Sequence, residues 1–226
     1  RRPIIIVGSI ARRMELSGLI ARIKVPIFTT VAAKGVIDEF LNVSAGIYTG
    51  AGLELTPEYN LFNHADLVIG IGLRNEEVIS AHPFPCQSIS VDNVSGESLE
   101  GFDFKYMTYL SNISLLLDAL NSHQWGMDLV EETKHGLNKV LCESSFLPYQ
   151  AFDVLSKTLP KNRRVVIDTG NFCTIAEHGW SASQPSEFLC AANSRYMGTA
   201  IPLGVAVSLY QPNIPTVIAV GDGGIG

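Results

Sequence analysis

The sequence predicts an α/β protein with two successive open parallel-sheet layer domains. Short runs of β-branched residues have the character of strands that are covered on both faces. Segments with a helical spacing of apolar residues alternate with these runs. The alternation stops in a polar stretch near the middle of the chain and then starts again. We therefore expect a first, Rossmann-like domain over residues 1–121, a linker over 122–147, and a second, truncated domain over 148–226.

The first domain opens with a strand at 4–7, where three isoleucines precede a valine. An apolar stripe predicts a helix over 11–24, and a second strand follows at 26–30. The remaining predicted elements are a Gly-rich loop at 46–52, a helix over 57–64 capped by Thr56, strands at 67–71 and 87–91, and a helix ending at 115–120.

The second domain repeats this alternation. The predicted elements are a helix over 149–159, a strand at 165–168, a polar turn and helix at 171–179, a strand at 188–191, a helix over 199–209 and a strand at 216–220. The last strand has no helix after it to cover the sheet, so we interpret this domain as interrupted.

The composition limits the function. The 226 residues carry 16 Lys+Arg and 22 Asp+Glu, a net charge of −6, which argues against nucleic acid or an anionic membrane as partner. With 46% hydrophobic and 17% charged residues, disorder is excluded. The four cysteines form no C-x-x-C pair and no apolar run reaches about 18 residues, so we expect a cytoplasmic protein without zinc site, disulfide framework or membrane span.

The most specific motif is Gly221-Asp222-Gly223-Gly224, directly after the last predicted strand. A carboxylate at the carboxyl end of a parallel strand suits Mg²⁺, and glycines let the backbone approach a diphosphate closely. A tight turn with a solvated aspartate explains the motif equally well.

Two further segments have a chemical and a purely structural interpretation. Met197 precedes a Gly- and Ala-rich helix start, where its thioether could press against a flat ring, although a core methionine is commoner. Asp168-Thr169-Gly170-Asn171 ends a strand and could offer N–H groups to phosphate, or it could be an ordinary turn with Asn171 as helix N-cap.

These three segments, in this order, resemble the diphosphate-binding domain of thiamine diphosphate-dependent enzymes. The likeness is closest to the acetolactate synthase, pyruvate oxidase and 2-keto-acid decarboxylase superfamily. The first domain is similar to that family's central domain. The segments that carry the resemblance are Arg2 through Gly8, Thr29-Thr30, Ala33-Lys34-Gly35, Ala65-Asp66-Leu67 through Arg74, Asp168-Thr169-Gly170, Arg195 through Pro202, and Gly221-Asp222-Gly223.

The resemblance implies a role for each matching residue. Asp222 would bind Mg²⁺, and Met197 would hold the bent cofactor with its backbone N–H directed at the pyrimidine. The backbone carbonyl of Arg195 would receive the 4′-amino group, although the family usually has glycine at this position. The residues that would line the diphosphate are Gly170, Asn171, Gly221, Gly223 and Gly224.

The implied activity of the intact protein is decarboxylation of a 2-keto acid, carboligation, or both, as in acetolactate synthase. The cofactor accepts the electrons released when CO₂ leaves. The family's pyrimidine-binding Glu and second metal ligand lie outside this sequence, so we expect these 226 residues alone to be inactive. The resemblance also implies a homodimer or tetramer through the diphosphate-binding domain.

Alternatives remain. A non-catalytic or regulatory homologue would have no reason to keep Asp222. A nucleotide-binding α/β oxidoreductase needs a G-x-G-x-x-G loop, and the first strand is followed by Gly8 alone. For the same reason FAD or ADP in the first domain is possible but not favoured. Arg74 could face such a nucleotide or pair with Glu76 or Glu77.

The other candidate side chains are expected to be structural. His178 is interpreted as a surface residue at a helix end, and Cys173 and Cys190 as small buried apolar residues.

Overall fold

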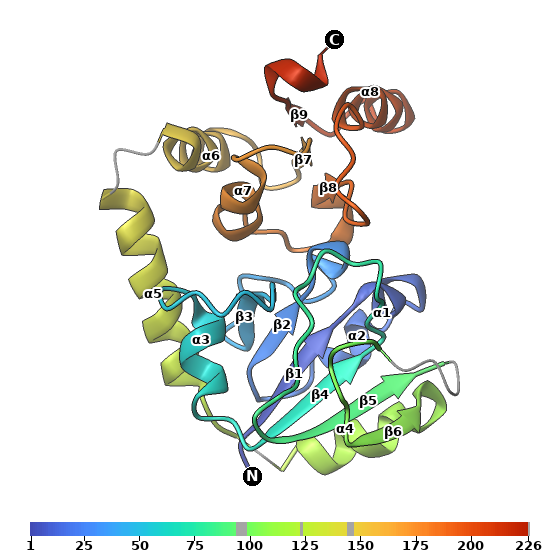
Figure 1. The fold of residues 1–226 in the computed structure, drawn as a ribbon. Helices are drawn as coiled ribbons and strands as arrows, with labels where there is room; N and C mark the ends of the chain where they lie inside the picture. The colour runs from blue at the N-terminus through green and yellow to red at the C-terminus, as the bar shows by residue number, and fades with distance from the viewer. Residues whose placement is uncertain (94–98, 123, 144–146, 226) are drawn as a thin grey trace.

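The computed structural model describes residues 1–226 except 94–98, 123, 144–146 and 226. It contains a six-stranded sheet with the order β3-β2-β1-β4-β5-β6 and a three-stranded sheet with the order β8-β7-β9. Every strand pair within them is parallel. Figure 1 shows the two sheets in separate parts of the molecule, each accompanied by helices. The predicted fold class is confirmed.

The first sheet is fully buried along its central strands. Every residue of β1 (Pro3–Val7) and β4 (Leu67–Ile71) is buried. The other strands are β2 (Ile27–Thr29), β3 (Ser44–Ile47), β5 (Gln87–Asp92) and β6 (Tyr106–Tyr109). Strands β3 and β6 were not predicted from the sequence. Residues of β3 such as Ser44 and Gly46 are small, so the segment has no β-branched run to mark it.

Alternate residues of β1 enter two different cores, because neighbouring side chains on a strand point to opposite faces. Ile5 belongs to one buried cluster, and Ile4 and Ile6 belong to the other. Both faces of the sheet are therefore apolar, which explains the continuous apolar runs in the sequence.

The helices of the first domain differ from prediction at the first helix and at the Thr56 cap. In place of the helix expected over 11–24 there are two short helices, α1 (Ser9–Arg13) and α2 (Ser17–Ile20). Between them Glu15 has a φ of 53°, which ends a right-handed helix. The other helical elements are η1 (Val31–Ala33), α3 (Pro57–Phe62), η2 (Leu110–Asn112) and α4 (Ile113–Leu120). Thr56 stands at the N-cap of α3, but its hydroxyl donates to the Leu53 carbonyl and does not cap the helix.

The segment predicted as a linker contains a long helix, α5 (Met127–Glu143). It packs against α3 and β3, and Val130 is buried in the first domain's core. Just before it, the Trp125 indole donates to the Pro3 carbonyl at 2.6 Å. Figure 1 shows α5 running along one side of the first domain towards the second.

The second domain surrounds the smaller sheet. Its elements are α6 (Leu147–Thr158), β7 (Arg164–Ile167), α7 (Cys173–Gly179), η3 (Pro185–Glu187), β8 (Phe188–Cys190), α8 (Ala200–Tyr210), β9 (Thr216–Ala219) and η4 (Asp222–Gly224). β7 is buried, whereas β9 is half-buried throughout and Leu209 and Tyr210 on α8 are exposed. In Figure 1, α8, β9 and the C-terminus lie at the end of the molecule farthest from the first sheet.

Buried charges join the two domains. The Lys34 ammonium lies 2.7 Å from the Glu39 carboxylate and donates to the Glu177 carbonyl at 2.8 Å. The Glu39 carboxylate in turn accepts from the Ala182 backbone N–H at 2.8 Å. Because Lys34 is only 2% exposed, this junction is shielded from water.

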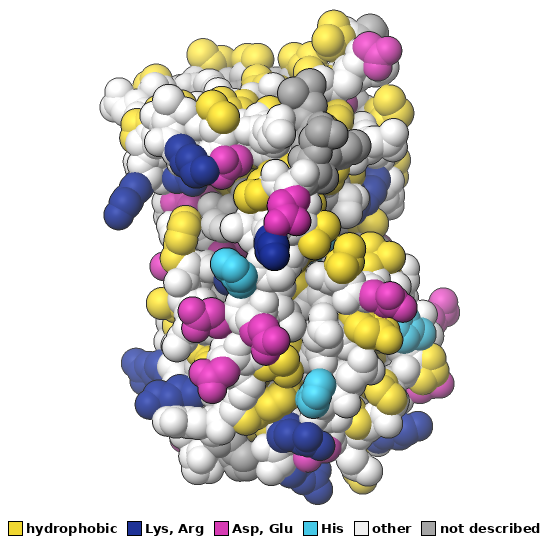
Figure 2. All heavy atoms as spheres, turned by 90° about the vertical axis from the view of Figure 1, so that its left-hand side faces the viewer, with side chains coloured by type: hydrophobic (Ala, Val, Ile, Leu, Met, Phe, Trp, Pro, Cys, Tyr) yellow, Lys and Arg dark blue, Asp and Glu magenta, His cyan; other side chains and the backbone are white. Residues whose placement is uncertain are grey.

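The surface drawn in Figure 2 carries acidic and basic side chains interspersed with one another. None of the helices in the described part of the chain combines the length and the apolar character that spanning a bilayer requires.

Candidate cofactor-binding edge

The three motif segments of the second domain meet where its strands end. β7 and β9 are adjacent and parallel, so their carboxyl ends lie at the same edge of the sheet. Asp168 follows β7 directly, and η4 follows β9 after two residues. The turn before α8 joins them there through the Asp168 side chain.

Asp168 fixes the start of α8. Its carboxylate accepts hydrogen bonds from the backbone N–H groups of Gly198 (2.9 Å) and Thr199 (3.2 Å). Burial opposes ionisation of Asp168, but these backbone donors outweigh it and lower the pKa of the side chain. A Cβ on Gly224 would lie 2.1 Å from the same carboxylate, so only glycine fits there. Sequence reasoning included Asp168 in a motif but missed this capping role.

Gly170 and Gly221 flank one aromatic ring. A Cβ added to Gly170 would lie 2.7 Å from Phe172 Cε1, and one added to Gly221 would lie 3.7 Å from it. Phe172 stands at the N-cap of α7, so Asn171 is not the cap of that helix. Asn171 is exposed at the same edge.

Met197 and Asp222 are both accessible. A Cβ on Gly223 would lie 2.9 Å from Met197 Cε, so the thioether end of Met197 lies against this glycine. Met197 is 59% exposed and is therefore not a core residue. Asp222 is exposed as well, and within the part of the chain that the structure describes its carboxylate has no hydrogen-bond or ion-pair partner.

This edge suits a metal-bound diphosphate attached to a flat ring. It combines an unused carboxylate, a backbone free of Cβ atoms and a polarizable thioether. Among the described residues no group of three or more His, Cys, Asp or Glu could hold a metal ion.

The side chain of Arg195 is held by residues of α7. Its guanidinium contacts both carboxylate oxygens of Glu177, at 2.7 Å and 3.0 Å, and also donates to the Cys173 sulfur. Glu177 is only 1% exposed. The sequence offered no signal for this pair, because 18 residues and a turn separate its members.

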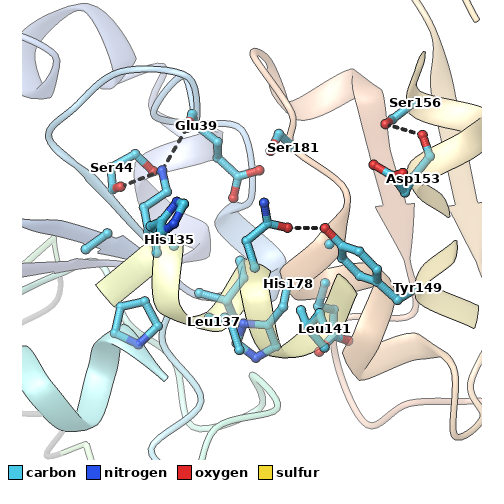
Figure 3. A pocket seen from close by; sticks show the side chains of 18 residues that line it. Glu39, Ser44, His135, Leu137, Leu141, Tyr149, Asp153, Ser156, His178 and Ser181 are labelled. Carbon is cyan, nitrogen blue, oxygen red and sulfur yellow. Dashed lines mark hydrogen bonds between the residues drawn. The ribbon is translucent and has the colours of Figure 1, made fainter. Parts of the chain in front are cut away.

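A cavity of about 380 Å³ lies elsewhere, between the domains, and is lined by residues of β3, α5, α6 and α7 (Figure 3). His178 lines it and is partly buried, which corrects the prediction of a surface residue. Burial, and secondarily the charge of Lys34, lower the pKa of His178 to about 4. Lys134 donates to the carbonyls of Glu39 and Ser44 at 3.1 Å and 3.0 Å on the first-domain side of the cavity. No predicted site residue lines this cavity.

At the corresponding edge of the first sheet, polar groups pair with one another. The Arg74 guanidinium forms an ion pair with Asp92 and also donates to the Leu73 carbonyl and to the Asn93 side chain. The Glu77 carboxylate accepts from the Ser9 N–H at 2.8 Å and from the Thr30 hydroxyl.

Comparison with known proteins identifies the family. Residues 1–120 match the model of the thiamine pyrophosphate enzyme central domain, and residues 168–226 match that of the C-terminal TPP binding domain. The chain belongs to the thiamine pyrophosphate enzyme family. It is also 24% identical over 237 aligned residues to the "Probable 2-ketoarginine decarboxylase AruI" of Pseudomonas aeruginosa. That alignment covers 99% of this chain and 42% of the relative, so this thiamine pyrophosphate enzyme chain spans well under half of the relative's length.

Proposed function

We propose that the complete polypeptide is a thiamine diphosphate- and Mg²⁺-dependent enzyme that decarboxylates a 2-keto acid. The proposal includes carboligation of the acetolactate synthase type, because the part of the 2-keto acid that remains after CO₂ leaves can be released or be joined to a second carbonyl. Family membership supports the cofactor. The name of the Pseudomonas relative supports a 2-keto acid as substrate.

One observation carries this proposal. The thioether end of Met197 lies against Gly223, the neighbour of the exposed Asp222, although Met197 and Asp222 are 25 positions apart in the sequence. A site for a ring joined to a metal-bound diphosphate needs this combination at one place.

The roles proposed for the residues are those that the family resemblance implies. Asp222 would ligate Mg²⁺, and Met197 would support the ring system from below. The backbone carbonyl of Arg195 would accept a hydrogen bond from the cofactor's amino group. The residues proposed to line the diphosphate are Gly170, Asn171, Gly221, Gly223 and Gly224. Bound thiamine diphosphate supplies an electron sink for cleavage of the bond next to a carbonyl.

The first domain is proposed to be structural and to hold neither FAD nor ADP. The polar side chains where its strands end are engaged with each other, as the Arg74–Asp92 and Glu77–Thr30 contacts show. The assembly is proposed to be a cytoplasmic homodimer or tetramer that associates through the diphosphate-binding domain.

The test is a calorimetric titration of the full-length protein with thiamine diphosphate in the presence of Mg²⁺. Asp222→Asn should weaken binding at least about tenfold, because a neutral amide replaces a charged ligand of a hard cation. Asp118→Asn, which removes an exposed carboxylate on α4, serves as the matched control and should bind like the wild type.

Equal affinities in the wild type and Asp222→Asn would contradict the metal role of Asp222. A wild-type protein that binds no thiamine diphosphate would instead favour the non-catalytic homologue.

A further inference from the structure

The turn before α8 has an unusual backbone. Ser194 and Arg195 have φ values of 65° and 46°, and Gly198 has a φ of 77°. The left-handed region is unfavourable for residues other than glycine, and such conformations persist where the surroundings hold them in place. Something must therefore hold Ser194 and Arg195 in this geometry.

The Arg195 side chain provides that hold. It makes a two-point ion pair with Glu177 of α7, with N–O distances of 2.7 Å and 3.0 Å, and contacts Cys173 on the same helix. A bidentate guanidinium–carboxylate pair fixes orientation as well as distance. Loss of the Arg195 partner would leave the buried Glu177 carboxylate unpaired, and an unpaired charge is energetically costly away from water.

Helix α7 is itself anchored to the first domain. The carbonyl of Glu177 accepts a hydrogen bond from Lys34 at 2.8 Å, and Lys34 pairs with Glu39. The Arg195–Glu177 pair thus connects the turn to α7, which the buried Lys34–Glu39 pair holds against the first domain.

The far end of the turn is fixed by Asp168, which accepts from the N–H groups of Gly198 and Thr199. Between these two attachments lie Tyr196 and Met197, with exposed fractions of 65% and 59%. The turn therefore presents Met197 and the Arg195 carbonyl from a backbone that is held on both sides.

We propose that Arg195 is a positioning residue, whose ion pair with Glu177 holds Ser194 and Arg195 in the left-handed geometry that directs the Arg195 carbonyl and Met197 towards the cofactor. This inference rests on the proposed function. It assigns the Arg195 guanidinium to the scaffold of the site and not to the substrate.

Two variants of the full-length protein test this role. Glu177→Gln keeps the shape of the buried side chain and removes its charge, while Arg195→Gln changes a residue with partial exposure. The control is Asp153→Asn, which removes an exposed ion pair with Lys157 in the same domain. We expect both test variants, but not the control, to bind thiamine diphosphate about tenfold more weakly.

A second measurement is independent of cofactor and activity. In the apo protein, amide hydrogen exchange of residues 194–198 should be about tenfold faster in both test variants, because the turn loses one of its two attachments. Exchange in β1 should remain unchanged. At saturating thiamine diphosphate, the KM for the 2-keto acid should stay within about twofold of the wild type.

Unchanged cofactor affinity or unchanged exchange in the test variants would overturn the proposal. A raised KM in Arg195→Gln without one in Glu177→Gln would also overturn it, because the guanidinium would then contact substrate. If the wild type binds no thiamine diphosphate, the proposed function fails, while the exchange measurement still reports whether the ion pair holds the turn.

Discussion

The two sheets of this protein end in different ways. At the carboxyl edge of the first sheet, Arg74 binds Asp92, and Glu77 binds Ser9 and Thr30. At the carboxyl edge of the second sheet, Met197 and Asp222 are exposed. Parallel sheets bind ligands at this edge. In the first domain the polar side chains at this edge therefore pair with each other, whereas in the second domain two side chains are left accessible, as the proposed cofactor site requires.

The largest expected effect on stability comes from breaking the buried Lys34–Glu39 ion pair at the junction between the domains. Lys34→Met should lower the free energy of unfolding by about 3–5 kcal/mol, because Glu39 is left as a buried charge without its cation. Denaturant unfolding measures this loss. Lys157→Met removes an exposed partner of Asp153 and should change stability by less than about 0.5 kcal/mol. Equal effects of the two substitutions would contradict a buried junction.

The same substitution at both edges sharpens the comparison. In Gly8→Ala the new Cβ would lie 2.5 Å from the Gly72 carbonyl oxygen and 2.6 Å from Leu73 Cα, and this backbone cannot easily yield. A loss of about 3 kcal/mol in unfolding free energy is expected. In Gly223→Ala the Cβ meets only the flexible end of Met197, so the loss should stay below about 1 kcal/mol, while thiamine diphosphate affinity falls about tenfold.

Gly136→Ala, on α5 with open space around the new Cβ, is the control and should stabilise the protein by up to about 1 kcal/mol. If Gly223→Ala destabilised the fold as much as Gly8→Ala, the two edges would be equally closed.

A pH dependence is expected to be smaller than the losses in Lys34→Met and Gly8→Ala. The pKa of His178 is lowered to about 4, so the folded protein binds its proton less readily than the unfolded chain, whose His titrates near 6.5. This contribution to stability is present above about pH 6.5 and is lost as the pH falls towards 4. Between pH 7.5 and 5 it amounts to about 2 kcal/mol, and His178→Gln should lack it. Parallel stability–pH curves for the two proteins would contradict a neutral, partly buried His178.

Local signals in the sequence predicted much of the fold. The β-branched runs predicted β1 and β4. The helix and strand that precede the G-D-G-G motif, α8 and β9, lie within about a residue of their predicted positions. Helix 11–24 was wrong, because apolar spacing does not report the left-handed Glu15. The apolar pattern of α5 is weak in the sequence, because Val130 and Thr133 are its only buried described residues.

Part of the candidate site could likewise be predicted from the sequence, and part could not. Its glycines and Asp222 belong to short contiguous motifs, which a single sequence displays. The Arg195–Glu177 pair and the Lys34–Glu177 contact join residues 18 and 143 positions apart. Such contacts arise only when the chain folds, so no local pattern could predict them.

The most direct test of the open edge is a crystal structure of the complete polypeptide with thiamine diphosphate and Mg²⁺. We predict that an Asp222 oxygen ligates the metal at about 2.0–2.1 Å. We also predict that Met197 packs against the ring system of the coenzyme. A structure in which Asp222 points into solvent while the metal and diphosphate bind elsewhere, or not at all, would contradict this account.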